Sequence, residues 1–489
     1  MSTPEQQDEW MKPGKTLWRV AKADRMTVVV DAEDYFRAAR RAMLGAKRRI
    51  LLIGWDFDAR IILDHEVDKP QPVGAFIHSL VQQNPDLEVF LLRWDLGALK
   101  TLGRGSTFFT VLKWMRHPRI HTKLDGHHPT GASHHQKIVI IDDCLAFCGG
   151  IDMTADRWDT RAHLDDDPRR RRPTTRRRYK PWHDSISAVS GPVAHALGQL
   201  FRERWRAAGG EPTLLPDADH TGDVAGCWPE GLPVDFEDVE VGIARTMPEM
   251  DDQVPAHESE ALFLEQIAGA KRQLYVESQY FASRRIAEAI ARRLDEADGP
   301  EIVVINPLTA QGWLEPLAMD TARARLMEAL RRRDKHGRLR MYHPYTAGGT
   351  PIYVHAKILV ADDRVLRLGS SNMNNRSLRL DTECDLTIAP EEAEKRACIR
   401  AIRDGLIAEH LGTTRETAAA AIDEHGLIGA IERLRGDGRS LRPYEVPDLS
   451  SVEEWLADNE VLDPEGPEEM FEALSKRGLF RRWGSWRRR

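Results

Sequence analysis

A duplicated segment constrains the fold of this chain more than any other feature of its sequence. The residues from His135 to Met153 align without gaps to those from His355 to Met373, and the two copies begin 220 residues apart. The identical positions are His135/His355, Lys137/Lys357, Ile138/Ile358, Asp142/Asp362, Asp143/Asp363, Gly149/Gly369 and Met153/Met373. Because the spacing is the size of a domain, the pattern predicts a duplicated domain and excludes a solenoid of short repeats.

The local pattern around the two copies is typical of an α/β protein. In each copy, an apolar run rich in β-branched residues meets a tight turn at the aspartate pair, and a second strand then ends at a glycine. Strand and helix patterns alternate ahead of both copies. Strands are expected at 25–30, 48–57 and 274–281, and helices at 31–47, 259–273 and 321–337. This alternation predicts sheets that are covered by helices.

The length of 489 residues favours two or three domains over a single core. The stretch 209–232, rich in Pro, Gly and Asp, is the candidate boundary between the two halves. We therefore expect an N-terminal lobe at 1–225 with the first motif and a C-terminal lobe at 226–412 with the second. Residues 413–489 are expected to form an appendage with a helical part, an acidic segment and a basic, aromatic tail.

The charge distribution argues against a nucleic-acid-binding protein. The formal net charge is -7, although residues 476–489 alone carry +7, which leaves -14 for the rest of the chain. A body with this charge repels a phosphate backbone, so no nucleic acid is expected as partner.

Composition also bears on the cellular location of the protein. No window of about 18 apolar residues is present, and the N-terminus lacks the apolar region of a secretory signal. The five cysteines have no disulfide-like spacing, which favours reduced thiols. We expect a cytoplasmic protein, which would be peripheral on the inner face of a membrane if its substrate is a lipid.

The repeated His-x-Lys pair can bring two bases and two cations into one site. On a strand, residues i and i+2 project from one face, so each His and its Lys are expected to point together. If the copies meet, two imidazoles and two ammoniums share one site. A neutral imidazole can attack phosphorus, and a second, protonated imidazole can give a proton to the leaving alkoxide. Lys137 and Lys357 can hold the non-bridging oxygens.

The duplicated His-x-Lys-x₄-Asp motif resembles the signature of the phospholipase D superfamily. Flanking blocks agree with the eukaryotic-type phospholipases D, at 149–152, 157–160, 181–184, 191–192, 276–281 and 369–372, with Ser278 where that family has Asn. The resemblance covers most of residues 35–410. It implies two pseudo-twofold-related α/β lobes, each a mostly buried mixed sheet flanked by helices, with one active site at their interface.

The resemblance also implies roles for individual residues. His135 would be the nucleophile that forms a phosphohistidine, and His355 the general acid and base, although the residues alone do not order the two. The phosphate would be held by Lys137, Lys357 and Asn372, and the imidazoles oriented through Nδ1 by Asp184 and Glu383. The remaining candidate catalytic residues are Asp142 and Asp362, for which a structural role is favoured because each begins a turn.

Further residues are expected to line the site: Gly149, Gly150, Asp152, Gln279, Tyr280 and Ser370. Asp152 occupies the position that pairs with Asn372, which puts a symmetrical phosphate contact in question. Gln279 and Tyr280 would equally suit the packing of a strand. No cofactor and no metal are expected, because the pairs at 127–128 and 134–135 lack Cys or His partners at zinc-like spacing.

The predicted function is hydrolysis of glycerophospholipids to phosphatidate and the head alcohol, with transfer to other alcohols as a second outcome. The alternatives are a cardiolipin synthase-like phosphatidyltransferase, a nuclease of the same superfamily and a catalytically silent membrane-binding protein. The blocks at 157–160, 181–184 and 276–281 favour the first. Because both motifs lie in one chain, a monomer would suffice, but the sequence does not define the oligomeric state.

Two basic segments are candidate contacts to anionic lipid at the surface of the substrate membrane. Residues 169–180 contain eight Arg or Lys, and the tail at 476–489 mixes seven cations with four large apolar residues. A run like the first is usually a solvated, mobile loop, and its position between two flanking blocks is what suggests the lipid contact. The second has the composition of an interfacial anchor, or of a disordered end.

Overall fold

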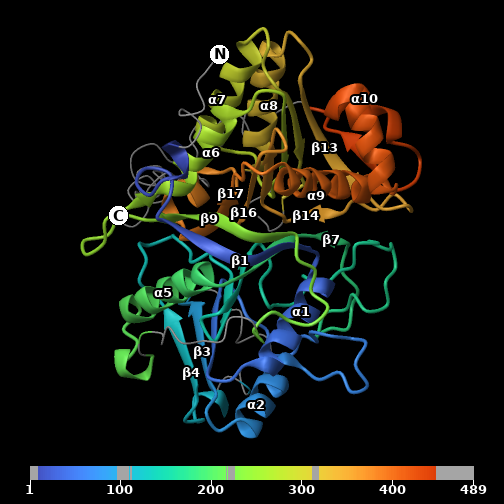
Figure 1. Ribbon diagram of the computed structural model, residues 1–489. Helices are drawn as coiled ribbons and strands as arrows, with labels where there is room; N and C mark the ends of the chain where they lie inside the picture. Colours follow the sequence, from blue (N-terminus) through green and yellow to red (C-terminus); the bar gives the residue numbers. More distant parts are fainter. Residues whose placement is uncertain are drawn as a thin grey trace, which may run out of the picture.

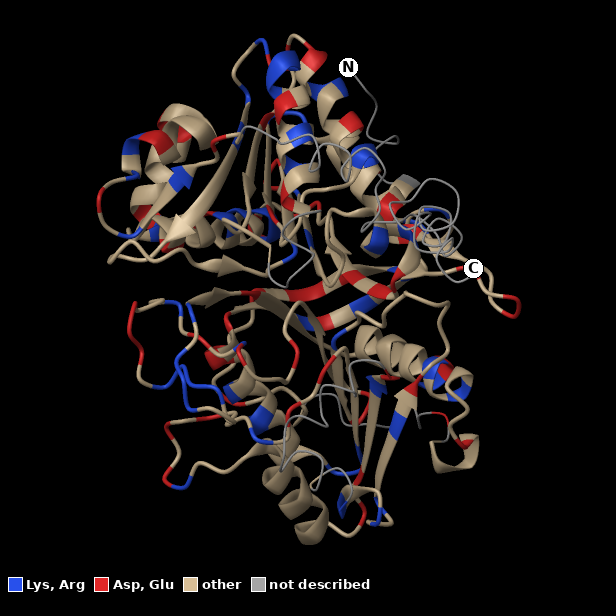
Figure 2. Ribbon diagram, turned by 180° about the vertical axis from the view of Figure 1, so that it is seen from behind, with Lys and Arg blue, Asp and Glu red and all other residues tan. Residues whose placement is uncertain are grey.

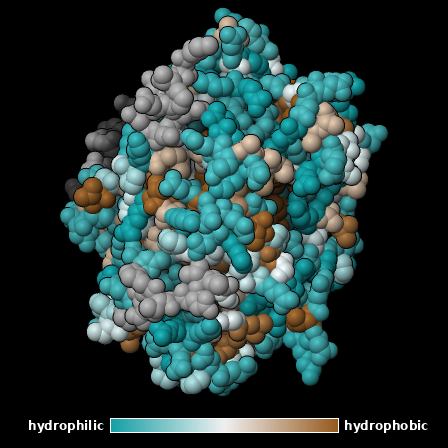
Figure 3. All heavy atoms as spheres, in the orientation of Figure 1, coloured by the Kyte–Doolittle hydropathy of each residue, from teal (hydrophilic) through white to brown (hydrophobic). Residues whose placement is uncertain are grey.

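The computed structural model describes residues 9–447 apart from 96–109, 111–112, 216, 218–225 and 311–318. Two halves lie one above the other in Figure 1 and share a central sheet with helices packed around it. Acidic and basic residues are interspersed over both halves (Figure 2). The face in Figure 3 is covered mostly by hydrophilic side chains.

The first half contains eight strands and three main helices within its described residues. The strands are β1 (Arg19–Val30), β2 (Arg49–Gly54), β3 (Glu88–Trp94), β4 (Ile120–Asp125), β5 (Ile138–Ile141), β6 (Leu145–Gly149), β7 (Trp182–His183) and β8 (Ser185–Ser190). The helices are α1 (Ala32–Gly45), α2 (Val73–Gln83) and α5 (Pro192–Ala207).

The second half has ten strands and five main helices within its described residues. The strands are β9 (Phe236–Met247), β10 (Ala256–His257), β11 (Gln273–Glu277), β12 (Glu301–Ile305), β13 (Leu339–Tyr345), β14 (Tyr353–Val354), β15 (Ile358–Ala361), β16 (Val365–Gly369), β17 (Glu383–Ile388) and β18 (Ser440–Pro443). The helices are α6 (Glu258–Gly269), α7 (Arg284–Asp295), α8 (Thr321–Arg333), α9 (Ala393–Leu411) and α10 (Arg415–Leu434).

One mixed sheet of 16 strands runs through both halves. Outward from the centre, the first half has the order β1-β8-β6-β5-β2-β3-β4 and the second the order β9-β17-β16-β15-β11-β12-β13. The two strand orders are equivalent, because the motif hairpins β5-β6 and β15-β16 occupy the same position in their respective halves. The sheet is continuous because β1 pairs with β9 in antiparallel register, for example Met26 with Phe236. The predicted α/β class is confirmed.

The outer strands of each half are parallel, and helices cover them on both faces. Such strands are expected to be apolar throughout, and β2 and β3 are buried along nearly their whole length. Helix α1 turns a stripe that includes Tyr35, Phe36 and Met43 towards the sheet. This packing fixes the hairpins whose ends carry the motif residues.

The C-terminal segment differs in part from the expectation of a helical appendage. Helix α10 is present, but β18 follows it and extends the sheet by pairing antiparallel with β13. Residues 451–472 and 476–489 lie outside the described residues. Among the described residues, none of the helices has the combined length and apolarity that a membrane span requires. All five cysteines are free thiols.

Candidate active site

Backbone hydrogen bonds between the halves hold the two motif histidines. The His135 N–H donates to the carbonyl of Thr382 (2.9 Å), and the His355 N–H donates to the carbonyl of His183 (2.7 Å). The prediction that each His-x-Lys pair lies on a strand is therefore wrong in detail. Both pairs lie just before β5 and β15. The histidine N–H groups bond to the opposite half, whereas the lysine carbonyls accept from Gly149 and Gly369 of their own half.

The two imidazoles face one another across the junction of the halves. Their ring centroids are 6.4 Å apart, at an interplanar angle of 64°. His135 Nδ1 lies 3.0 Å from both carboxylate oxygens of Glu383 and 3.1 Å from the Ser370 carbonyl oxygen. A carbonyl oxygen can only accept, so Nδ1 carries the hydrogen and Nε2 keeps its lone pair. His355 Nδ1 lies 2.7 Å from Oδ2 of Asp184.

The two motif lysines are buried but have different partners. Lys137 Nζ lies 3.2 Å from Oδ2 of Asp152. Lys357 Nζ donates to Oε1 of Gln279 (3.4 Å) and forms no ion pair within the described part of the chain. The amide of Asn372 donates to the same Gln279 oxygen, and its own Oδ1 is buried without a hydrogen bond. The departure of Asp152 from Asn thus makes the site electrostatically asymmetric, with Lys357 as the less compensated cation.

Family models match the chain in two segments. Residues 42–288 match the model described as phospholipase D, and residues 263–398 match the one described as cardiolipin synthase, PLD-like domain. The chain belongs to the phospholipase D superfamily. The duplicated His-x-Lys-x₄-Asp motif and its flanking blocks are the features by which the residues alone indicated this family.

Curated relatives and a solved structure agree with this membership. Phospholipase D A of Dictyostelium discoideum is 23% identical over 76% of this chain and 33% of its own length. Phospholipase D alpha 1 of Carica papaya is 22% identical over 79% of this chain and 64% of its own length. This chain therefore spans one third to two thirds of these relatives. The phosphatidylserine synthase of Haemophilus influenzae Rd KW20 has a similar fold, with a TM-score of 0.57, 13% identity and coverage of 88% and 98%.

Burial and the lysine charges set the protonation of this superfamily member's site. Burial, together with Lys137 and Lys357, holds the pKa of His135 well below its usual range. Burial, Lys357 and Arg157 do the same for the pKa of His355. Burial also lowers the pKa of Lys357 to about 7, and the nearby Lys137 adds to this effect. A phosphodiester between the ammoniums would offset their charge and favour protonation of one imidazole.

An aromatic wall beside His355 was not predicted. The indole of Trp182 stacks on Tyr353 (4.7 Å) and lies 5.1 Å from the His355 ring. The Arg157 guanidinium sits 4.2 Å from the same indole. The Tyr353 hydroxyl accepts a hydrogen bond from the amide of Gln279 (2.9 Å). Tyr353 lies two residues before His355, and alternate residues of an extended segment share a face. This spacing could have indicated an aromatic side chain beside His355.

The remaining predicted lining residues support the site at close range. Tyr280 accepts a hydrogen bond from the Gln279 amide (3.0 Å). A Cβ on Gly150 would lie 2.1 Å from Oδ1 of Asp184, and one on Gly149 would lie 2.6 Å from Cα of Ile186. Glycine at 150 therefore leaves room for the Asp184 carboxylate, and glycine at 149 allows the close approach of β6 and β8.

The two motif aspartates lie away from the imidazoles, at the opposite ends of β5 and β15. Asp142 accepts from the backbone N–H groups of residues 47–49 (2.7–2.8 Å). Asp362 accepts from those of residues 271–273 (2.6–3.0 Å). Both have positive φ, 50° and 54°. They anchor the starts of β2 and β11 and do not reach the reacting groups, which corrects their place among the candidate catalytic residues.

Asp142→Ala is expected to lower the free energy of unfolding by about 3 kcal/mol, because three N–H groups lose a charged acceptor. Asp142→Asn should cost less, since Asn tolerates positive φ and keeps one acceptor oxygen. Urea denaturation midpoints would measure both, with kcat per folded molecule unchanged. A lost kcat at an unchanged midpoint would place Asp142 in the chemistry instead.

The kcat/KM of the enzyme is expected to fall as pH rises through about 7. Lys357 is a cation below its pKa, which lies at about 7, and becomes a neutral amine above it, so the free enzyme loses a phosphate-binding charge. In Lys357→Arg the charge persists, and the alkaline limb should move upward even if the maximum is lower. An alkaline limb that stays in place in this variant would assign it to another group.

The other histidines considered for a metal are engaged in separate polar contacts, although the His128 and His134 rings lie 5.1 Å apart, edge to face. His127 Nε2 binds Asp252 (3.1 Å), and His128 Nε2 binds Asp95 (2.9 Å). His134 lies between Asp125 (3.1 Å) and the hydroxyl of Thr382 (2.6 Å). Each imidazole thus has its own polar partner in the described structure.

Proposed function

We propose that this chain is a phospholipase D-type phosphodiesterase that hydrolyses glycerophospholipids to phosphatidate and the head alcohol. The observation that carries this proposal is the pair of imidazoles 6.4 Å apart, each with a carboxylate on Nδ1 and a buried lysine beside it. The site combines a nucleophile, an acid and two phosphate-binding cations. The names of the curated relatives support the same activity.

The reaction proceeds in two displacements at phosphorus. The Nε2 lone pair of His135 attacks, the bond to the head-group oxygen breaks, and protonated His355 gives its proton to the leaving alkoxide. His355, now neutral, takes a proton from water as the water attacks the phosphohistidine. The P–N bond then breaks, phosphatidate leaves, and both imidazoles return to their starting states. Lys137, Lys357 and Asn372 hold the non-bridging oxygens throughout.

A phosphatidyltransferase is the second candidate. It is favoured by the match of residues 263–398 to the cardiolipin synthase model. The same intermediate serves both activities, and an alcohol replaces water in the second displacement. The difference therefore lies in which acceptor reaches His355.

Product analysis tests the proposal. The full chain is incubated with phosphatidylcholine vesicles and, separately, with phosphatidylglycerol vesicles, and the lipids are identified by mass. Release of choline with phosphatidate is the expected result. Cardiolipin from the second vesicles without choline from the first would establish the transferase. Salt-sensitive DNA cleavage would indicate a nuclease, and vesicle binding without turnover a silent binding protein.

The basic segment 169–180 is partly engaged within the protein. Arg169, Arg170, Arg172 and Arg178 form ion pairs with nearby aspartates. The exposed Arg171, Arg176, Arg177 and Lys180 form no ion pair with the described residues. These four cations, together with the tail at 476–489, are the proposed contacts to anionic headgroups, with the protein peripheral on the inner face of a membrane.

Arg176→Gln/Arg177→Gln is expected to weaken binding to phosphatidylserine vesicles by roughly tenfold or more, at about 1 kcal/mol per cation. Deletion of 476–489 should weaken it further. Arg292→Gln/Arg331→Gln, on the exposed faces of α7 and α8, is the matched control and should bind as the wild type does. Sedimentation with vesicles measures all of them, and equal losses in the two double variants would remove the segment from the lipid contact.

A further inference from the structure

A second cluster of histidines and carboxylates lies behind His355, and the reaction above does not use it. Asp31, at the end of β1, meets His163 and His183 from the same half and Glu409 of α9 from the other half. One donor atom from each of the four side chains lies within 4.8 Å of all the others. Their side chains are at most 4% exposed. Four metal-ligating groups thus converge at a buried point between the halves.

Four nitrogen–oxygen distances in the cluster are close to the spacing between ligands of a tetrahedral ion. His163 Nε2 lies 3.3 Å from Asp31 Oδ2 and 3.2 Å from Glu409 Oε1. His183 Nδ1 lies 3.4 Å from Asp31 Oδ1 and 3.1 Å from the same Glu409 oxygen. Ligands bound to zinc at about 2.0–2.1 Å in tetrahedral geometry are themselves about 3.3 Å apart.

Each histidine also has the outer partner that metal ligands need. His163 Nδ1 lies 3.0 Å from Asp159, and His183 Nε2 lies 2.7 Å from Glu277. A carboxylate on the far nitrogen holds the hydrogen there and turns the lone pair of the other nitrogen inward. Asp159 is fixed in turn by Arg170, and Glu277 by the Tyr275 hydroxyl and His410.

Two polar atoms that point into the cluster are left without a hydrogen bond. They are Nδ1 of His183 and Oδ2 of Asp31, and both are fully buried. His183 Nδ1 lies 3.4 Å from Asp31 and 3.1 Å from Glu409 without a hydrogen bond to either. Burying such groups without a hydrogen bond is costly, and a cation bound between them would compensate both.

The cluster attracts positive charge. Three carboxylates, those of Asp31, Asp159 and Glu409, lie within 3.3 Å of the ring nitrogens of His163. The same carboxylates favour a cation at the centre. Arg161 binds the outer oxygen of Glu409 (2.6 Å), which leaves Oε1 for the centre, and Arg439 lies 3.5 Å from Oε1.

We propose that Asp31, His163, His183 and Glu409 bind one divalent transition-metal ion of the zinc class. Two imidazole nitrogens with two carboxylates suit zinc, whereas calcium and magnesium favour sites made of oxygen alone. The sequence-based expectation of a chain without a metal is revised accordingly. The ion is outside the reaction, since neither motif histidine belongs to the cluster.

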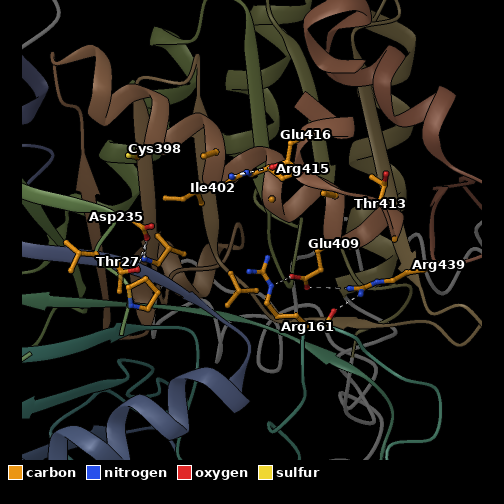
Figure 4. Close-up of a pocket in the computed structure, with 18 residues that line it drawn as sticks. Thr27, Arg161, Asp235, Cys398, Ile402, Glu409, Thr413, Arg415, Glu416 and Arg439 are labelled. Carbon is orange, nitrogen blue, oxygen red and sulfur yellow. Dashed lines mark hydrogen bonds and ion pairs between the residues drawn. The ribbon is translucent and has the colours of Figure 1, made fainter. Parts of the chain in front are cut away.

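The ion would position the acid of the reaction and join the halves. The carbonyl of His183 accepts the His355 N–H, and the next residue, Asp184, binds His355 Nδ1. Three ligands come from the first half and one from the second. A groove of about 700 Å³ reaches the cluster from the surface, and Glu409 lies on it between Arg161 and Arg439 (Figure 4). This groove provides a path for the ion.

Metal content and spectroscopy of the full chain test the proposal. After incubation with zinc and gel filtration, the wild type should hold about one zinc per chain, and X-ray absorption should show nitrogen and oxygen neighbours at about 2.0–2.1 Å. Chelator-treated protein should gain thermal stability when zinc is restored. A folded wild type that holds no zinc and gains no stability would overturn the proposal.

Three variants locate the ion. His163→Gln should bind zinc at least tenfold more weakly, and Asp159→Asn, which keeps all four ligands, roughly 10–100-fold more weakly. Asp159 also binds Arg170 and the Trp182 N–H, so variants with wild-type thermal stability are compared. His127→Gln alters a histidine–carboxylate pair outside the cluster and should keep the full zinc content. If His163→Gln does not fold, the zinc affinity of Asp159→Asn and the X-ray absorption spectrum of the wild type test the proposal. Undiminished zinc in folded His163→Gln or Asp159→Asn would refute the assignment.

Discussion

His135→Ala and His355→Ala are each expected to lower kcat by roughly 10³-fold or more, and the double variant should be little worse than either. The reason is that the two imidazoles act on one phosphorus atom as a unit, so losing one removes the function of both. Release of choline from phosphatidylcholine vesicles is the measurement. His127→Ala, at a surface pair with Asp252, is the control and should keep full activity. Substantial activity in either single variant would refute the shared site.

The same variants can show which imidazole is the nucleophile. A substrate with a nitrophenolate leaving group needs no proton from the enzyme. With it, His355→Ala should release a burst of about one nitrophenol per enzyme and then stall as the phosphohistidine, whereas His135→Ala should show no burst. The hydrogen on Nδ1 of His135, fixed by the carbonyl of Ser370, supports this order. A burst only in His135→Ala would reverse the two roles.

The catalytic pair could be predicted because its information is local and occurs twice. Each His-x-Lys pair adjoins an apolar strand and a turn, and the duplication implies that the copies meet. The structural role of Asp142 was also predictable, since an aspartate at positive φ in a tight turn binds nearby N–H groups. The position of the pairs just before the strands could not be predicted, because the backbone bonds to Thr382 and His183 cross between the halves.

The features that sequence reasoning missed depend on residues far apart in the chain. The pairing of β1 with β9 joins the halves into one sheet, although a stretch rich in Pro and Gly separates them in sequence. The cluster of Asp31, His163 and Glu409 spans nearly 380 positions, and no spacing rule connects them. Of the four cluster residues, only His183 lies in a flanking block that resembles the family, and the role implied there belongs to its neighbour Asp184. Long-range pairing of this kind is set by the packed tertiary structure.

Asp184→Asn is expected to lower kcat by about 10³–10⁴-fold with little change in KM. In the native site, Oδ1 of Asp184 accepts from the Ser185 N–H (2.8 Å) and Oδ2 faces His355 Nδ1 (2.7 Å). In Asn, the carbonyl oxygen must keep the Ser185 bond, so the amide N–H₂ faces the imidazole and donates to it. His355 is then held in the wrong tautomer, and the imidazolium loses its counter-charge.

Glu383→Gln provides the matched comparison, with an expected loss of only about 10–10²-fold. The carbonyl of Ser370 lies 3.1 Å from Nδ1 of His135 and still accepts its hydrogen when the carboxylate is gone, so the nucleophilic tautomer survives. Steady-state kcat with phosphatidylcholine, measured on variants with wild-type thermal stability, separates the two. A loss in Glu383→Gln as large as that in Asp184→Asn would show that charge, and not the tautomer, is what each carboxylate supplies.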